Sequence, residues 1–325
     1  MLVPVLLFLV GFALLIKGGD WFVDGSVGIA RRFHLPELLI GATVVSIGTT
    51  LPEVMVSSQA ALEGNAGISY GNAIGSIICN TSLIAALTVA VKPGKVNPKS
   101  FLLPTAFFFA AALSYAAIAW TAGRFERWMG IAYLAVFLIY MIVTVAQMKK
   151  HPELAEDGGE AEDGEKEKPM AQELLMLLIG AVAIAIGARL LVDNGTKIAA
   201  ALGVPDSVIG LTMVALGTSL PELITAITSL MKGHGALSLG NVIGANLFNI
   251  VLVSGAAITI SPFAIPAEKV LPGGINSSLV IDLPVMLGVM AILCVPALIK
   301  GKLKRWQGVL LLCIYAAFTV YQFVS

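Results

Sequence analysis

The chain has 325 residues, of which 58% are hydrophobic and 12% are charged. This balance is unlike that of soluble domains and is typical of a polytopic membrane protein. The formal net charge is zero, so no basic excess points to a nucleic acid partner. The three cysteines, Cys79, Cys294 and Cys313, are odd in number and widely spaced, which argues against a disulfide framework or a zinc site.

Apolar runs of membrane-spanning length predict ten transmembrane helices. They cover residues 2–27, 37–61, 69–91, 101–121, 128–147, 171–197, 206–231, 238–261, 279–299 and 306–323. The first run lacks the preceding Lys or Arg and the small-residue cleavage site of a signal peptide, so we interpret it as a span. The chain is therefore predicted to be all-α, with transmembrane repeat 1 in residues 1–147, an acidic cytoplasmic linker of disordered composition in 148–170 and transmembrane repeat 2 in 171–325.

The two halves are related by an internal duplication whose alignment pairs Pro36 with Pro205 and continues without gaps. Residues 36–58 and 205–227 are identical at 10 of 23 positions, and residues 69–80 and 238–249 at 6 of 12. Because five spans are an odd number, the second half must enter the membrane from the opposite side. The sequence thus predicts two inverted five-helix repeats, with a binding site at the midplane where they meet.

One six-residue phrase occurs in each half, as GTTLPE from Gly48 to Glu53 and as GTSLPE from Gly217 to Glu222. A carboxylate at the centre of a spanning helix costs roughly 2.5–3.5 kcal/mol. We therefore predict that Glu53 and Glu222 bind a cation or carry a proton. A buried glutamate beside a proline kink can also be a protonated packing residue, but a kink does not need a matched acid in both halves.

Proline and hydroxyl residues place more oxygen atoms around each glutamate. Pro52 and Pro221 lack an N–H group and leave the carbonyls of Gly48 and Gly217 without helical partners. In the bilayer, such carbonyls are tolerated only when buried in protein or lining a polar cavity. Hydroxyl groups lie three and four residues before each glutamate, on the same helical face, and belong to Thr49, Thr50, Thr218 and Ser219. These ligands suit hard cations such as Ca2+, Na+ or Mg2+.

A second polar element follows each phrase, SYGNAIGSIICN in the first half and SLGNVIGANLFN in the second. Asn72, Ser76 and Asn80 are spaced four residues apart and share one helical face; the second copy repeats the pattern as Asn241, Ala245 and Asn249. We expect Asn80 and Asn249 to be ligands, and Asn72 and Asn241 to brace the helices. The alternative is that all four asparagines serve only packing and interhelical hydrogen bonds.

The distribution of basic residues predicts the orientation of the chain. Loops after the odd-numbered spans hold 14 of the 20 Lys and Arg residues, and the opposite loops hold four. By the positive-inside rule, both termini are predicted to be extracytoplasmic.

With these motifs in view, the sequence resembles the cation/Ca2+ exchanger superfamily, and most closely its prokaryotic sodium/calcium exchanger-like branch. The resemblance rests on GTTLPE with GNAIGS and on GTSLPE with GNVIGA, and it covers nearly the whole chain. It implies a ten-helix antiporter in which the first and sixth helices slide over the others. It also implies that Na+ and Ca2+ compete for one cluster, formed by Glu53, Glu222, Thr49, Thr50, Thr218, Ser219, Ser76, Asn80 and the backbone of Ser46 and Ala215.

The second half departs from one common pattern of that superfamily. Some relatives carry Ser at the position of Ala245 and Asp at the position of Asn249. The loss of one hydroxyl and one potential charge weakens the case for a peripheral Na+ site there. It also leaves K+ co-transport and the ion stoichiometry open.

The function expected from these features is a secondary antiporter that exchanges Na+ for Ca2+ across the cell membrane by alternating access. A Ca2+/H+ antiporter with the same fold is one alternative, because a buried glutamate can carry a proton. A passive cation channel is another, although its acids normally ring an oligomer axis. Motifs of metalloproteases, serine hydrolases and P-loop ATPases are absent from the sequence. We expect a monomer in the lipid bilayer whose only bound partners are the transported Ca2+ and Na+, with no cofactor.

Overall fold

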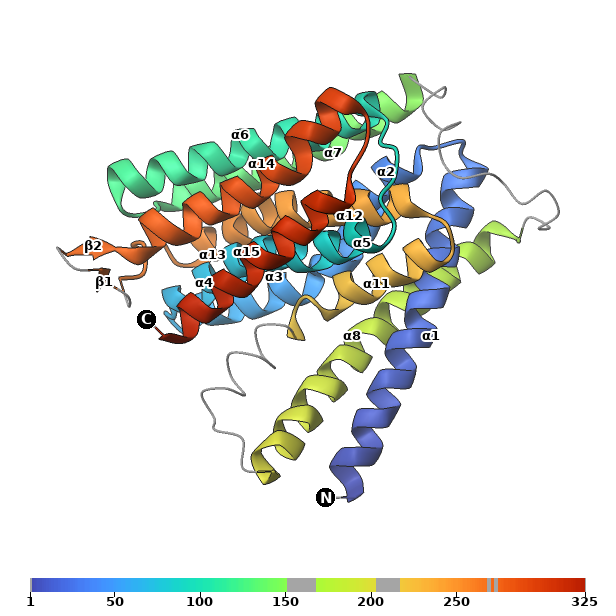
Figure 1. The fold of residues 1–325 in the computed structure, drawn as a ribbon, viewed down its shortest axis with the longest axis horizontal. Coiled ribbons are helices and arrows are strands. Elements are labelled where there is room, and N and C mark those ends of the chain that lie inside the picture. Colours follow the sequence, from blue (N-terminus) through green and yellow to red (C-terminus); the bar gives the residue numbers. More distant parts are fainter. Residues whose placement is uncertain (1, 151–167, 203–216, 268–269, 272–273, 325) are drawn as a thin grey trace.

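The structure is a computed structural model, and it describes residues 2–150, 168–202, 217–267, 270–271 and 274–324 (Figure 1). Each predicted span has a helical counterpart, although that of 206–231 is described only from Gly217 onward. In chain order the elements are α1 (Leu2–Arg32), α2 (Glu37–Ile40), η1 (Gly41–Val45), α3 (Ser46–Leu62), α4 (Ala66–Cys79), η2 (Asn80–Ala85), α5 (Ala86–Val91), α6 (Pro98–Ala122), α7 (Arg127–Lys150), α8 (Met170–Ala201), α11 (Leu220–Met231), α12 (Gly235–Phe248), η5 (Asn249–Ser254), α13 (Gly255–Ile260), β1 (Val270–Leu271), β2 (Ile275–Asn276), η6 (Ser278–Asp282), α14 (Leu283–Lys300) and α15 (Arg305–Val324).

Within these ranges, eight helical segments are long and apolar enough to cross a membrane. Several are composite, because short π-helical turns (η) join two α-helices into one span, as in Glu37–Leu62, Ala66–Val91 and Gly235–Ile260. A short antiparallel hairpin, with Leu271 opposite Ile275, was not predicted and lies between α13 and η6. It is confined to a connection, so the spanning architecture remains helical.

Loop contacts reveal how the two halves are related. In repeat 1, Lys95 follows α5 and forms an antiparallel bridge with Lys302, which lies between α14 and α15 of repeat 2. Ala264 follows α13 in repeat 2 and bridges to Arg124, between α6 and α7 of repeat 1. Extending the repeat alignment pairs Ala264 with Lys95. Each repeat therefore contacts the other through equivalent loops, as expected for a pseudo-two-fold axis between them.

Helices α1 and α8 pack against each other along much of their length and lie beside the remaining bundle (Figure 1). Glycines form the seam: a Cβ atom on Gly11 would lie 2.9 Å from the Gly187 carbonyl oxygen, and one on Gly18 would lie 3.0 Å from that of Gly180. The repeat alignment pairs Gly11 with Gly180 and Gly18 with Gly187. The contact between Gly11 and Gly187 is therefore the symmetric equivalent of the contact between Gly18 and Gly180. Small residues of this kind let helix backbones approach closely inside a membrane.

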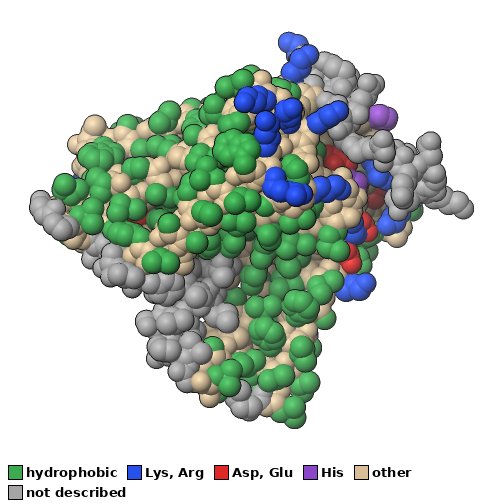
Figure 2. All heavy atoms as spheres, in the orientation of Figure 1, with side chains coloured by type: hydrophobic (Ala, Val, Ile, Leu, Met, Phe, Trp, Pro, Cys, Tyr) green, Lys and Arg blue, Asp and Glu red, His purple; other side chains and the backbone are tan. Residues whose placement is uncertain are grey.

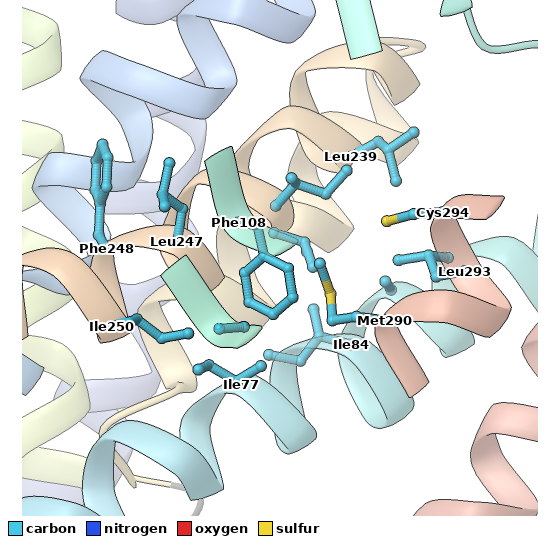
Figure 3. Packing of buried hydrophobic residues seen from close by; sticks show 14 of the residues in the cluster. Ile77, Ile84, Phe108, Leu239, Leu247, Phe248, Ile250, Met290, Leu293 and Cys294 are labelled. Carbon is cyan, nitrogen blue, oxygen red and sulfur yellow. The ribbon is translucent and has the colours of Figure 1, made fainter. Parts of the chain in front are cut away.

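The core lies between α4, α6, α12 and α14, where large apolar side chains are buried (Figure 3). Phe108, Phe248 and Met290 are fully buried there. Apolar side chains are spread over the visible outer surface, as a lipid-facing surface requires, whereas Lys and Arg side chains gather at one end (Figure 2). The Lys95–Lys302 bridge joins two of the loops that the distribution of basic residues predicts to be cytoplasmic.

Candidate cation-binding site

The two glutamate phrases adopt different local structures in spite of their similar sequences. In repeat 1 the helix α3 begins at Ser46, directly after η1, and continues through Pro52. In repeat 2 the helix α11 begins only at Leu220, with Pro221 in its first turn, where proline is well tolerated. The glutamate of repeat 2 is therefore presented by a helix N-terminus, and that of repeat 1 by a helix interior.

Glu53 and Glu222 are both fully buried, and they are close enough to repel each other electrostatically. In the part of the chain that the structure describes, none of their four carboxylate oxygens has a hydrogen-bond partner. Buried polar groups are normally hydrogen-bonded, and a buried carboxylate without a partner is especially unfavourable. Such a pair is stabilised either by a bound cation or by a proton.

Further unpartnered oxygen atoms come from the residues predicted to surround the glutamates. Thr50 and Ser219 are buried, and their hydroxyl groups have no hydrogen-bond partner among the described residues. The same holds for both side-chain polar atoms of Asn80 and Asn249, which are fully buried. The chemistry of this set, with carboxylate, hydroxyl and amide oxygens from both repeats, fits Ca2+ or Na+.

Two π-helical turns begin on the matched asparagines. The turn η2 covers Asn80–Ala85 and η5 covers Asn249–Ser254, so the two turns occupy equivalent positions in the repeat alignment. Such turns are rare and occur often at functional sites, because they alter the hydrogen-bond ladder of the backbone. In η5 the Ser254 hydroxyl donates to the Asn249 carbonyl at 3.0 Å. No motif in the sequence predicts these turns.

Asn72 and Asn241 both form hydrogen bonds with α3, the helix that carries Glu53. Asn72 Nδ2 donates to the backbone carbonyl of Glu53 at 3.1 Å and to Ser57 Oγ at 2.8 Å. Asn241 Oδ1 accepts from the Thr49 hydroxyl at 3.1 Å, across the boundary between the repeats. These bonds join each polar element to a glutamate phrase.

Thr49 and Ser46 also connect the two halves. The Thr49 hydroxyl lies close to the Glu222 carboxylate without forming a hydrogen bond of ordinary geometry. Ser46 Oγ lies 2.8 Å from the Gly41 carbonyl oxygen and 2.9 Å from the Asn241 carbonyl oxygen, and these two acceptors compete for its single proton. The Ser46 hydroxyl is thus engaged by the protein, which leaves its backbone as the part available to an ion.

The remaining predicted residues have different placements. Ser76 is buried on α4, and Thr218 is half-buried in the turn before α11. Pro52 and Pro221 line one small cavity together with Thr49, against side chains of α1 and α8. Ala215 lies outside the described residues. That the predicted set ligates ions stays a prediction.

Other buried polar residues near the site were missed by the sequence analysis. Thr225 and Ser229 follow Glu222 on α11 at spacings of three and seven, and within the described ranges their hydroxyls have no partner. Their helical spacing could have revealed them. Thr81 and Asn246 were missed because repeat 1 has no asparagine at the position of Asn246 and repeat 2 has no hydroxyl at that of Thr81.

Inverted repeats in a membrane protein, each carrying a buried glutamate whose oxygens lack partners among the described residues, are typical of a cation transporter. The sequence profile of the family described as "Sodium/calcium exchanger protein" matches residues 3–146 and 173–324, and the chain belongs to that family. It is therefore a membrane cation exchanger of that family and not an enzyme.

Individual proteins show the same relationship. The chain is 31% identical over 351 residues to the sodium/calcium exchanger MaX1 of Methanosarcina acetivorans, with 98% of each chain covered. It is 35% identical over 275 residues to the inner membrane protein YrbG of Escherichia coli, with 81% of each chain covered. The solved structure of the sodium-calcium exchanger NCX_Mj soaked with 2.5 mM Na+ and 0.1 mM Ca2+ superimposes with a TM-score of 0.78 at 35% identity, covering 98% of this chain and 97% of that one. The predicted multi-pass fold of ten helices in two inverted repeats is thus confirmed.

Proposed function

We propose that this protein is an antiporter that exchanges Na+ for Ca2+ by alternating access at the cluster around Glu53 and Glu222. The observation that carries the proposal is the pair of fully buried carboxylates, one from each repeat, without partners among the described residues. Their combined charge near −2 matches one Ca2+. Several Na+ ions, spread over the carboxylate, hydroxyl and amide oxygens, would neutralise the same charge.

Exchange, as opposed to leakage, follows from the charge of the empty cluster. Two unpaired carboxylates in a low-dielectric interior are strongly unfavourable, and more so when the surrounding helices close over them. Only cation-loaded states would then pass between inward-facing and outward-facing arrangements. Each passage must therefore carry an ion, which makes transport in one direction depend on transport in the other.

We expect α1 and α8 to move relative to the other helices during this passage. They pack on each other through glycines, and each meets the glutamate phrase of its own repeat at a glycine. A Cβ atom on Gly48 would lie 2.9 Å from the Phe22 ring, and one on Gly217 would lie 2.6 Å from Val192. Because glycine has no side chain, the surfaces on which α1 and α8 pack are smooth at these contacts. Smooth helix surfaces can slide past each other more easily than surfaces with interdigitated side chains.

The orientation and state of the protein in the cell are part of the proposal. We expect the basic end seen in Figure 2 to face the cytoplasm and both termini to lie outside, as the distribution of basic residues predicts. YrbG is named an inner membrane protein, and we infer the cell membrane for this chain as well. Because the site is built from two repeats of one chain, a monomer suffices for transport.

Purified protein in liposomes tests the function directly. Vesicles loaded with Na+ and diluted into Na+-free medium containing radioactive Ca2+ should accumulate Ca2+, whereas vesicles loaded with K+ should not. Uptake driven by a pH gradient without Na+ would favour the Ca2+/H+ alternative. Ca2+ flux that needs no counter-ion at all would contradict exchange and indicate a channel.

A further inference from the structure

One hydrogen-bonded cluster crosses the boundary between the repeats, and two of its residues lie close in sequence to Asn80 and Asn249. Asn246, on α12, donates from Nδ2 to the Thr81 hydroxyl in η2 at 2.7 Å. The Met290 sulfur of α14 lies 3.2 Å from Asn246 Nδ2 and 3.2 Å from Thr81 Oγ1. All three residues are fully buried. Thr81 directly follows Asn80, and Asn246 lies three residues before Asn249.

The pseudo-symmetric counterpart of this contact has the opposite chemistry. In the repeat alignment, Thr81 is paired with Ile250 and Asn246 with Ile77. Both isoleucines are fully buried in the hydrophobic core, and they flank the Phe108 ring in Figure 3. The same crossing is therefore polar beside Asn80 and apolar at the symmetric position, whereas the asparagines themselves are matched.

The difference affects how firmly each π-helical turn is held. An apolar contact has no preferred direction, so isoleucine side chains can slide past each other at small cost. A buried hydrogen bond has a preferred distance and angle, and breaking it leaves unsatisfied polar groups. The Thr81 hydroxyl also contacts the Ile77 carbonyl at 2.8 Å, in the turn that leads into η2. Side chains from α12 and α14 thus fix η2 across the repeat boundary. The turn η5 carries isoleucine at the equivalent point, and its hydrogen bond from Ser254 to the Asn249 carbonyl lies within the turn itself.

We propose that Thr81, Asn246 and Met290 are positioning residues that hold Asn80 in place at the cation site. The two asparagines are then inequivalent: Asn80 is the fixed ligand, and Asn249 is the one that adapts when the cargo changes. This inference rests on the proposed function, because it treats Asn80 as a ligand. It deepens that function by separating two residues whose sequence contexts are alike.

Near-isosteric apolar variants test the proposal. Thr81→Val combined with Asn246→Leu removes both polar partners, and replacing both is far less harmful to folding than removing one. We expect the purified double variant to bind Ca2+ with a half-saturating concentration raised about tenfold, measured by the rise of its unfolding temperature with added Ca2+. In liposomes its maximal uptake rate at saturating Ca2+ should stay within about twofold of the unmodified protein. The single variant Thr81→Ser keeps the hydroxyl group and should bind Ca2+ with the affinity of the unmodified protein.

The mirrored position supplies a matched control. Ile250→Val removes one methyl group at the counterpart of Thr81 and should leave the Ca2+ affinity unchanged. Normal Ca2+ affinity in the folded double variant would overturn the proposal, and so would an equal loss of affinity in Ile250→Val. If the double variant does not fold, Met290→Leu takes its place, because it removes only the sulfur that both polar groups contact; a raised half-saturating Ca2+ concentration would support the proposal and an unchanged one would overturn it.

Failure of the proposed function has a different signature. The unmodified protein would then show no Na+-driven Ca2+ uptake. Na+ binding, read by the same thermal shift in the same variants, would still decide whether Thr81 and Asn246 position a cation ligand. An unaltered Na+ response in the double variant would overturn the positioning role.

Discussion

Replacing Glu53 or Glu222 by glutamine removes one negative charge and leaves the size of the side chain almost unchanged. Both residues are fully buried, and within the described ranges none of the four oxygens of the two carboxylates accepts a hydrogen bond. The substitution therefore disrupts no existing hydrogen bond of the carboxylate oxygens. Its effect on ion binding should come from the lost charge.

The size of that effect follows from the burial of the pair. Two unit charges about 4 Å apart interact by about 4 kcal/mol at an effective dielectric constant of about 20. A divalent cation that loses one of two carboxylate ligands should lose at least this much. Because every 1.4 kcal/mol is tenfold, we expect the half-saturating Ca2+ concentration to rise roughly a thousandfold in either variant.

The same substitution should act in the opposite direction on the cation-free protein. Removing one carboxylate relieves the repulsion between Glu53 and Glu222, so the unfolding temperature without cations should rise. Added Ca2+ should then raise it little further, because binding is lost. Radioactive Ca2+ uptake into Na+-loaded vesicles gives the transport readout. Glu63→Gln is the matched control, because Glu63 caps the same helix α3 and is exposed. Uptake at the normal rate and affinity in Glu53→Gln or Glu222→Gln would refute the reasoning.

Other substitutions test the supports of the site. Asn72→Ala removes two hydrogen bonds to α3 and should destabilise the protein by about 1–3 kcal/mol, read as a lower unfolding temperature in detergent; an unchanged temperature would show that the bonds contribute nothing. Gly180→Val should abolish Ca2+ uptake or folding, because even a Cβ atom there would lie 2.5 Å from the backbone nitrogen of Phe22; a transport-competent variant would contradict the close seam. Glu37→Ala leaves His234 without the partner it meets at 2.8 Å and should also lower stability by about 1–3 kcal/mol, with Glu37→Gln less harmful; equal stability of all three proteins would exclude a structural role for the contact.

The helical architecture was predictable because the bilayer imposes simple rules. Spans need about 20 apolar residues, and an odd number of spans in each repeat forces the second repeat to be inverted. The glutamates could be found because a buried charge is costly and here occurs twice at the same position. In the structure this cost is visible in the carboxylate oxygens of Glu53 and Glu222, which have no hydrogen-bond partner among the described residues.

Other features of the site could not be predicted, because they depend on how the repeats meet. The π-helical turns at Asn80 and Asn249 arise from packing, and no residue type marks them. Thr81 and Asn246 stand at positions where the two repeats differ, so a search for matched residues passes over them. The different helix starts around Pro52 and Pro221 likewise follow from tertiary context, since the phrases are nearly the same.

The glycine seam between α1 and α8 limits how the two halves of the chain can diverge. Gly11 packs on Gly187, and Gly18 packs on Gly180. Each contact therefore joins a glycine of one repeat to a glycine at a different, non-aligned position of the other repeat. A bulkier residue in either copy damages a surface that both copies share, and a compensating change is not available where both partners are already glycine. Gene duplication usually frees one copy to drift, but at these four positions neither half is free of the other.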